Sequence, residues 1–221
     1  TVIYIGKQDS KTLKIIKKIL RKNPSKKIFY GADWHIKKIN NKMVYKDKKN
    51  KITLKSKKIF SRGIWENVSL AIKVALDLNI SKKKILKSIQ NLAFEGRMQY
   101  IKKGKLRKLL FSKEKLLIDG CHSNSSAKNL SSYLKSLNAE VYGIWGIQKN
   151  RDPKKFLKNF KGIFKKIVTI KIPDEPNAMS SYDLYKIAKK NNFKADESKN
   201  IKDAFKKISS KEKKIIVIFG S

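Results

Sequence analysis

The sequence predicts an α/β fold with a largely parallel sheet, and three observations point to that class. Short apolar runs alternate along the chain with segments whose apolar residues recur every three to four positions, as in amphipathic helices. An acidic residue and a glycine directly follow one apolar run, which is typical of the carboxyl end of a buried strand. With 221 residues, of which 40% are hydrophobic, the chain can bury a sizeable core. Strands that alternate with helices imply parallel pairing through right-handed crossovers.

The first part of the chain is expected to combine strands, one hairpin and three helices. Proline at Asn23-Pro24 ends the first helix, and Ser81 is a typical N-cap for the third. A loosely alternating pattern around Asn40 and Asn41 indicates the hairpin. We expect strands over Val2–Ile5, Lys27–Tyr30 and Ile52–Leu54, the hairpin over Trp34–Tyr45, and helices over Ser10–Leu20, Ile64–Leu78 and Lys82–Asn91.

A boundary between two domains is predicted at Ala93–Arg97, because a helical region ends there and a new series of strands begins. The predicted domains are residues 1–93 and 94–221. We expect a hairpin formed by Met98–Ile101 and Leu106–Phe111, strands over Lys115–Ile118, Glu140–Ile144, Ile167–Ile170 and Ile215–Phe219, and helices over Ser126–Leu137, Pro153–Phe160, Ser181–Lys190 and Ile201–Ile208.

The chain is strongly basic, with a net charge of +38 and a pI near 10.2. Such a field attracts polyanions, so a basic nucleic-acid-binding α/β module is one candidate class. The lysines are scattered through every segment, however, and they greatly outnumber the arginines that read phosphates and bases. Codon bias toward A/T explains the same composition, and we expect no specific nucleic-acid partner.

Composition also indicates the compartment. No run approaches the roughly 18 apolar residues of a membrane span, and no charged and then apolar signal segment opens the chain. We therefore expect a cytoplasmic protein with no membrane partner. The single cysteine excludes an internal disulfide.

The polar cluster after Lys115–Ile118 is the main candidate site. Asp119 and His122 flank Gly120, which lets the backbone turn sharply and approach a ligand closely. The serines at 123, 125 and 126 are suited to cap the following helix, and an anion or a ribose can bind at such a helix start. The alternative is an ordinary strand-to-helix turn in which Asp119 is a cap and His122 only packs.

Other candidate residues are open to two interpretations each. Cys121 precedes His122, which suggests a thiolate nucleophile, but a lone cysteine is most often a small buried hydrophobe. Arg97 at the domain boundary has the fork geometry that binds phosphate, or is a surface arginine. Asn67 either packs or caps, or it reads the edge of a base.

Two site types are disfavoured by the sequence. Neither the loop G-x-x-x-x-G-K-S/T nor the loop G-x-G-x-x-G occurs, so this chain does not cradle a triphosphate in those ways. With two histidines and one cysteine, a structural zinc site is improbable. We assign no metal ligand to this chain.

Six segments together carry a family resemblance through their order and spacing. They are Trp65–Ala71, Phe94–Gln99, Ile118–Asn124, Gly146–Asp152, Ile172–Ala178 and Val217–Ser221. These resemble the signatures H-Q-x-x-N-A-x-x-A, W-P-G-R-x-Q, D-G-A-H-N-P, G-M-x-x-x-K-D, I-P-G-E-x-N-A and the start of G-S-L-Y-L-A-G of folylpolyglutamate synthase/dihydrofolate synthase, in the Mur ligase superfamily. The chain departs from the signatures at Cys121, Ser123, Asn124 and Arg151, where the family has Ala, Asn, Pro and Lys.

The resemblance implies a fold and an extent. Residues 1–93 are expected to be the C-terminal part of the central ATP-binding domain, and residues 94–221 a Rossmann-like C-terminal domain with a mostly parallel sheet. The chain is expected to be a fragment that lacks the N-terminal P-loop region, with its magnesium ligands, and the extreme C-terminus. The fragment alone is then expected to be inactive.

The resemblance also implies a reaction of folate biosynthesis and one-carbon metabolism. The intact enzyme, a monomer, is expected to use ATP and Mg²⁺ to phosphorylate a carboxylate of dihydropteroate or folate, which the amine of L-glutamate then attacks. The implied roles are adenine binding for Asn67, ATP-phosphate binding for Arg97, ribose binding for Asp119, and contact with the nucleotide or the reacting centre for His122. The alternatives are a Mur-type ligase of cell-wall precursors and the nucleic-acid-binding module.

Overall fold

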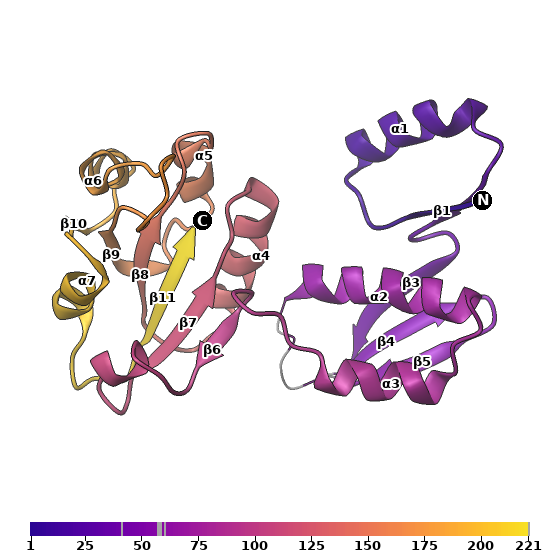
Figure 1. Ribbon diagram of the computed structural model, residues 1–221, viewed down its shortest axis with the longest axis horizontal. Coiled ribbons are helices and arrows are strands. Elements are labelled where there is room, and N and C mark those ends of the chain that lie inside the picture. The colour runs from indigo at the N-terminus through magenta and orange to yellow at the C-terminus, as the bar shows by residue number, and fades with distance from the viewer. Residues whose placement is uncertain (41, 57–58, 60, 221) are drawn as a thin grey trace. The chain divides into compact units, whose positions relative to one another are not determined.

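The computed structural model describes residues 1–40, 42–56, 59 and 61–220 (Figure 1). The chain divides into two compact units, an N-terminal unit of Thr1–Ala93 and a C-terminal unit of Phe94–Ser221. Each unit has its own hydrophobic core, since every core cluster among the described residues draws its members from one unit alone.

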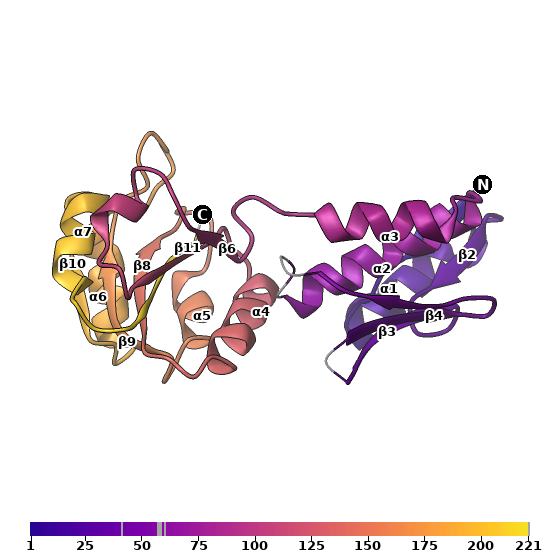
Figure 2. The ribbon, with the colours of Figure 1, turned by 90° about the horizontal axis from the view of Figure 1, so that it is seen from below.

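The N-terminal unit contains two small sheets and three α-helices in its described part. Strands β1 and β2 pair in parallel, whereas β3, β4 and β5 form an antiparallel sheet. Helices α2 and α3 lie along this antiparallel sheet (Figure 2) and supply buried residues to its core. The elements are β1 (Val2–Ile5), α1 (Ser10–Ile19), the 3-10 turn η1 (Leu20–Lys22), β2 (Lys26–Phe29), β3 (Trp34–Ile39), β4 (Lys42–Asp47), β5 (Lys51–Leu54), α2 (Arg62–Asp77) and α3 (Lys82–Asn91).

Short polar side chains set the starts of these helices, and the predicted cap Ser81 is confirmed. The Asp9 carboxylate accepts the N–H groups of Lys11 and Thr12 at the start of α1, and the Ser81 hydroxyl accepts an N–H of α3. The predicted hairpin is confirmed, since β3 and β4 pair antiparallel about a turn that includes Asn40 at φ 44°. Asn41, also predicted in this turn, lies outside the described residues.

The C-terminal unit is built on a six-stranded sheet in the order β10-β9-β8-β11-β7-β6. All neighbouring pairs are parallel except β6 with β7. The predicted α/β class with a mostly parallel sheet is therefore confirmed. The elements are β6 (Gln99–Ile101), the 3-10 turn η2 (Arg107–Leu109), β7 (Lys115–Asp119), α4 (Asn124–Lys135), β8 (Val141–Gly146), α5 (Pro153–Lys158), β9 (Phe164–Thr169), α6 (Ser181–Lys190), β10 (Ala195–Glu197), α7 (Ile201–Ile208) and β11 (Ile215–Gly220).

Helices cover both faces of this sheet. Helices α4, α5 and α6 bury apolar residues in one cluster, and α7 buries apolar residues in a second cluster on the opposite face (Figure 1). A group of stacked and tilted aromatic rings fills the first cluster, namely those of Trp145, Phe156, Phe160, Phe164 and Phe219. With both faces buried, the central strands read as almost continuous apolar runs, which is typical of parallel sheets.

One prediction about this unit is wrong, and one strand is missing from the predicted elements. The hairpin predicted for Met98–Ile101 and Leu106–Phe111 does not form: β6 pairs with β7 instead, and the second segment holds the 3-10 turn η2. The Arg107 guanidinium stabilises that turn, because it donates to the carbonyls of Leu110, Phe111 and Ser112. The second miss is β10, a three-residue edge strand without an apolar alternation, whose pairing with β9 defines it.

Candidate functional site

The candidate site lies at the carboxyl end of β7, where the segment that enters the C-terminal unit crosses the strand end. The N–H of Gly120 donates to the carbonyl of Gly96 at 2.7 Å. The N–H of Gly96 in turn donates to Oε1 of Gln99 at 2.8 Å. Gly96 has φ +63° and Met98 φ +45°, so the segment turns tightly. These bonds hold the Gly96–Met98 segment against the end of β7 within a single unit.

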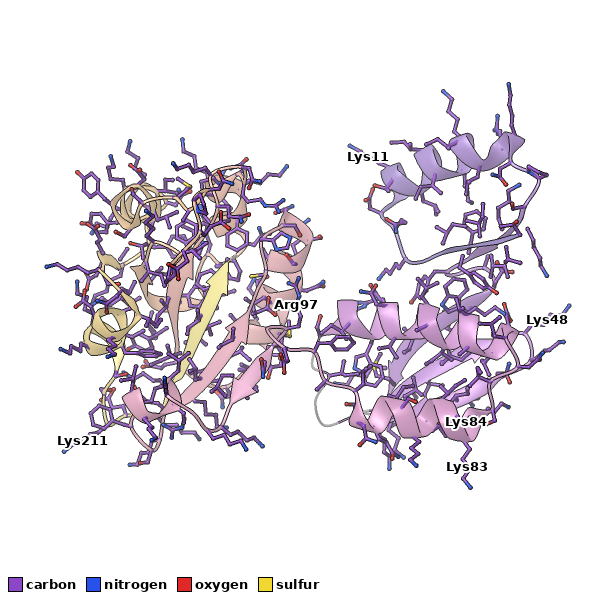
Figure 3. All side chains as sticks on the ribbon, viewed as in Figure 1. Lys11, Lys48, Lys83, Lys84, Arg97 and Lys211 are labelled. Atoms are coloured by element: carbon purple, nitrogen blue, oxygen red, sulfur yellow. The ribbon has the colours of Figure 1, made fainter. Side chains whose placement is uncertain are left out.

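Arg97 and His122 converge on one carbonyl oxygen, that of Gly120. Nη1 of Arg97, labelled in Figure 3, donates to this oxygen at 2.6 Å, and Nδ1 of His122 lies 3.1 Å from it. Because a carbonyl only accepts, the His122 contact is a hydrogen bond when Nδ1 carries the proton, which leaves a lone pair on Nε2 of the neutral ring. The site thus combines a fixed cation with an imidazole whose Nε2 can accept a hydrogen bond.

Asp119 is the last residue of β7, and its side chain is almost fully enclosed, with 5% of the residue exposed. Its Oδ2 accepts the N–H of Met98 at 2.9 Å. Burial raises the pKa of Asp119 above its ordinary value of 3.8, and this effect outweighs the hydrogen bond from Met98 and the charge of Arg97, which lower the pKa. The carboxylate is therefore a buried acceptor at the strand end.

Cys121 is fully buried beside this carboxylate. Burial raises the pKa of its thiol well above the ordinary value, and the neighbouring charge of Asp119 raises it further. The neutral thiol is a poor nucleophile. The interpretation of Cys121 as a nucleophile is wrong, and the residue is a small buried hydrophobe of the main core cluster.

At the start of α4, two residues that depart from the family signature make structural contacts. Ser123 is the N-cap of α4 and forms a reciprocal capping box with Ser126. Oδ1 of Asn124 accepts Nδ2–H of Asn159, which follows α5, at 2.8 Å. Ser123 and Asn124 therefore fix where α4 begins and how it meets the end of α5, a role that sequence reasoning left open.

Two further signature segments, one at the end of β8 and the other after β9, contact each other. Nε2 of Gln148 donates to Oε2 of Glu175 at 2.8 Å, and the N–H of Lys149 donates to the carbonyl of Asn177 at 2.7 Å. Gln148 and Glu175 both occur within segments that carry the resemblance, but neither was among the candidate residues predicted from the sequence. Ser221, at the end of the last segment, lies outside the described residues.

Asn67 belongs to the N-terminal unit, whereas Arg97, Asp119 and His122 belong to the other. It lies on α2 next to the buried residue Val68, but its own side chain is exposed. The interpretation of Asn67 as a buried packing amide is therefore wrong. Its amide is available to a ligand.

Residues 1–40, 42–56, 59 and 61–220 contain neither a metal-binding cluster nor a membrane-spanning helix. Within these ranges, no three side chains of His, Cys, Asp or Glu gather closely enough to hold a metal ion. Within the same ranges, no helix combines the length and apolarity that a membrane crossing requires.

The C-terminal unit, with helices on both faces of a mostly parallel sheet and polar residues at the end of one of its inner strands, is a doubly wound α/β domain. Solved structures that are similar in fold over the whole chain or nearly all of it include folylpolyglutamate synthases. The enzyme of Mycobacterium tuberculosis complexed with ADP has a TM-score of 0.80 and 16% identity, over 100% of this chain and 52% of that one.

Two further structures agree. E. coli FolC in complex with DHPP and ADP has a TM-score of 0.80 and 15% identity, over 100% of this chain and 50% of that one. Folylpolyglutamate synthase of Thermotoga maritima has a TM-score of 0.71 and 21% identity, over 97% of this chain and 50% of that one. The sequence matches no protein-family model and no curated protein. The resemblance predicted from the motifs is confirmed for the fold, and the chain spans about half the length of these structures.

Proposed function

We propose that this chain is part of an ATP-dependent ligase that joins L-glutamate to dihydropteroate or to folates. The observation that carries the proposal is the match of the whole chain to folylpolyglutamate synthases solved with ADP, at TM-scores up to 0.80. A related bifunctional enzyme was solved with Mn, AMPPNP and L-glutamate bound, which supports the same substrates here.

The proposed reaction has two steps. A carboxylate oxygen of the pteroate or folate attacks the γ-phosphorus of ATP, forming an acyl phosphate and releasing ADP. The amine of L-glutamate then attacks the acyl carbon and forms an amide bond. The bond between the acyl carbon and the phosphate oxygen breaks, inorganic phosphate leaves with that oxygen, and the amine loses its proton. A bound Mg²⁺ supplies neutralisation of phosphate charge. The described residues offer no cluster that fits the metal, so its ligands are assigned outside this chain.

The role proposed for each site residue comes from the family resemblance, and the contacts of the residue are compatible with it. Arg97 uses Nη1 to hold the Gly120 carbonyl, and its other guanidinium nitrogens are free to donate to an ATP phosphate. The lone pair on Nε2 of His122 accepts a hydrogen bond from the nucleotide or at the reacting centre. The Asp119 carboxylate is assigned to the ribose hydroxyls through oxygen lone pairs not used by Met98 or Cys121. The exposed amide of Asn67 is assigned to adenine.

The test compares two purified proteins in a phosphate-release assay. One is the 221-residue chain, which lacks a phosphate-cradling loop and should show no turnover. The other joins it to the polypeptide encoded directly upstream of Thr1, and should release phosphate only with ATP, Mg²⁺, L-glutamate and dihydropteroate or folate together. In this longer protein, Arg97→Ala should lower the affinity for ATP roughly tenfold to a hundredfold, because a charge-assisted hydrogen bond to the phosphate is lost. The exposed Lys161→Ala is the matched control.

The same assay separates the alternative functions. Turnover with a cell-wall precursor and not with pteroate or folate would identify a Mur-type ligase of another pathway. If no acceptor gives turnover, and the protein binds DNA tightly in a way that weakens steeply with salt, the nucleic-acid-binding module would be favoured. Full turnover by the 221-residue chain alone would show that the nucleotide is bound by residues other than those assigned.

A further inference from the structure

A cavity of about 410 Å³ lies in the N-terminal unit, between its antiparallel sheet and helix α3. This volume is within the range of sites that bind small organic molecules. Figure 1 shows α3 alongside β5, which is an edge strand of that sheet. The lining comes from β4, from β5 and the residue after it, and from α3, and it includes none of the candidate residues for the nucleotide. The lining residues are Lys42, Thr53, Lys55, Leu86, Ile89 and Gln90.

The sheet side of the cavity carries two lysines at opposite positions. Strands β4 and β5 are antiparallel, and Val44 pairs with Thr53. Two steps further, the same register places Lys42 opposite Lys55. Because alternate residues of a strand share a face, Thr53 lies on the same face as both lysines. Like charges at opposite positions of two strands repel each other and destabilise the pairing, so this pair favours an anion beside it.

No carboxylate of the N-terminal unit neutralises these lysines. In the part of the chain that the structure describes, neither Lys42 nor Lys55 forms a hydrogen bond or an ion pair through its side chain. Residues 1–93 contain five acidic side chains, and each is bonded to other groups. They are Asp9 at the start of α1, Asp33 with Phe29, Asp47 with Tyr45 and Asn50, Glu66 with Lys7 and Arg62, and Asp77 with Tyr4 and Lys73. The cavity is therefore positively charged on its sheet side.

The helix side of the cavity is apolar and ends in an amide. Leu86, Ile89 and Gln90 are three and four positions apart, so they share one face of α3. Ile89 is buried in the core of the unit, and Leu86 is half-buried and packs against that core, which fixes the apolar wall. The Gln90 amide is exposed and forms no hydrogen bond with any other described residue. The cavity thus combines an apolar wall with polar groups that have no partner in the described chain.

We propose that this cavity binds a small organic anion, with its carboxylate or phosphate group between Lys42 and Lys55 and its apolar body against Leu86 and Ile89. The Thr53 hydroxyl can donate a further hydrogen bond to the ligand. An inorganic anion would leave the apolar wall in water, and a neutral ligand would leave the two ammonium groups unpaired, so the lining favours a ligand with both parts. The inference concerns residues 42–90 alone and does not depend on the proposed ligase reaction.

A fluorescent anion tests this cavity without any activity measurement. The probe is 1-anilinonaphthalene-8-sulfonate, in which a sulfonate on an aromatic body stands in for the carboxylate or phosphate. Titration into the 221-residue chain should reveal a saturable site, with the largest changes in amide NMR shifts around Thr53 and Gln90. N-phenyl-1-naphthylamine has the same rings without the sulfonate and should bind at least about tenfold more weakly, because the charge-assisted hydrogen bonds are lost.

A pair of double variants assigns the charge to the cavity. Lys42→Gln, Lys55→Gln should fold, since both side chains are exposed, and should lower the affinity for the sulfonate probe at least about tenfold while leaving the affinity for the neutral probe unchanged. The matched control is Lys48→Gln, Lys83→Gln. It makes the same change in net charge at two exposed lysines of the same unit that do not line the cavity, both labelled in Figure 3, and it should bind normally.

Competition identifies the anionic group. 1-Naphthoate and 1-naphthyl phosphate should displace the sulfonate probe, and the tighter of the two shows whether the site prefers a carboxylate or a phosphate. Inorganic phosphate should displace it at least about tenfold less well, because it lacks the apolar body.

Three outcomes would overturn the proposal. The first is an equal loss of affinity in the two double variants, which would show that the overall charge of the chain holds the anion. The second is equal affinity for the charged and the neutral probe, which would identify an apolar cavity with no anion site. The third is displacement by inorganic phosphate as strong as that by the naphthyl compounds, which would show that the apolar wall contributes nothing.

Discussion

The backbone N–H of Met98 donates to Oδ2 of Asp119 at 2.9 Å, across 21 positions of sequence. This bond joins the first residues of the C-terminal unit to the end of its strand β7. It also gives the buried carboxylate a partner, without which an ionised oxygen at this depth would be costly. The structure thereby connects the entry segment, which carries Arg97, to the polar cluster at the strand end.

Asp119→Asn should change how stability depends on pH. Burial raises the folded-state pKa of Asp119 above its ordinary value of 3.8. Between pH 3.8 and the folded-state pKa, the folded chain holds a proton on Asp119 that the unfolded chain has lost. The contribution of Asp119 to the free energy of unfolding therefore falls as pH rises through this window, and it is constant above it. Urea unfolding of both proteins across this pH range should show the wild-type minus variant difference falling with pH. A difference that grows with pH would contradict this.

Two glycine-to-alanine substitutions should differ widely in cost. Gly220 has φ +123°, and an added Cβ would lie 1.7 Å from the carbonyl oxygen of Gly146 on the paired strand. Gly220→Ala should therefore lower the free energy of unfolding by at least about 3 kcal/mol. Gly162 also has positive φ, +73°, but no atom lies within 4 Å of the position that an added methyl group would take, so Gly162→Ala should cost about 1 kcal/mol. Equal losses in chemical denaturation would refute the role of the close approach.

Asn67→Ala should separate binding from stability. The side chain is exposed on α2, so the free energy of unfolding should change by no more than about 0.5 kcal/mol. If the amide contacts adenine, ADP affinity of the protein extended upstream should fall about tenfold, as for a lost hydrogen bond near 1.4 kcal/mol. Calorimetric titration measures the affinity, and Asn129→Ala, another exposed helix asparagine, is the control. An unchanged ADP affinity would remove Asn67 from the site.

Residues 94–221 should fold without the first 93. The described core clusters of this unit draw on no residue of the other unit, and a complete six-stranded sheet supports them. Limited proteolysis of the whole chain should cut first between Ala93 and Glu95, because Gly96 and the residues after it are bonded to β7 and Gln99. Thermal unfolding of the isolated unit should be cooperative. First cuts inside 116–144, or a non-cooperative transition, would contradict the division.

Local patterns along the chain predicted most elements because the interactions that form them are local. The serine before α3 and the apolar spacing of α2 are visible in a few consecutive residues. The turn η2 was missed because a guanidinium that donates to three carbonyls determines it, and β6 was paired wrongly because its partner β7 follows 14 or more positions later. Strand β10 exists only through its pairing with β9.

The sequence by itself determined the α/β class, since apolar periodicity and short motifs are properties of adjacent positions. It also predicted the boundary near residue 93 and the candidate residues at the end of β7. Only the tertiary structure decided what those residues do to one another. It placed Arg97 and His122 on the same carbonyl of Gly120, buried Asp119 against Met98, and enclosed Cys121 as a neutral thiol. Burial and long-range hydrogen bonds decide charge states and partners, and they arise only when distant segments pack together.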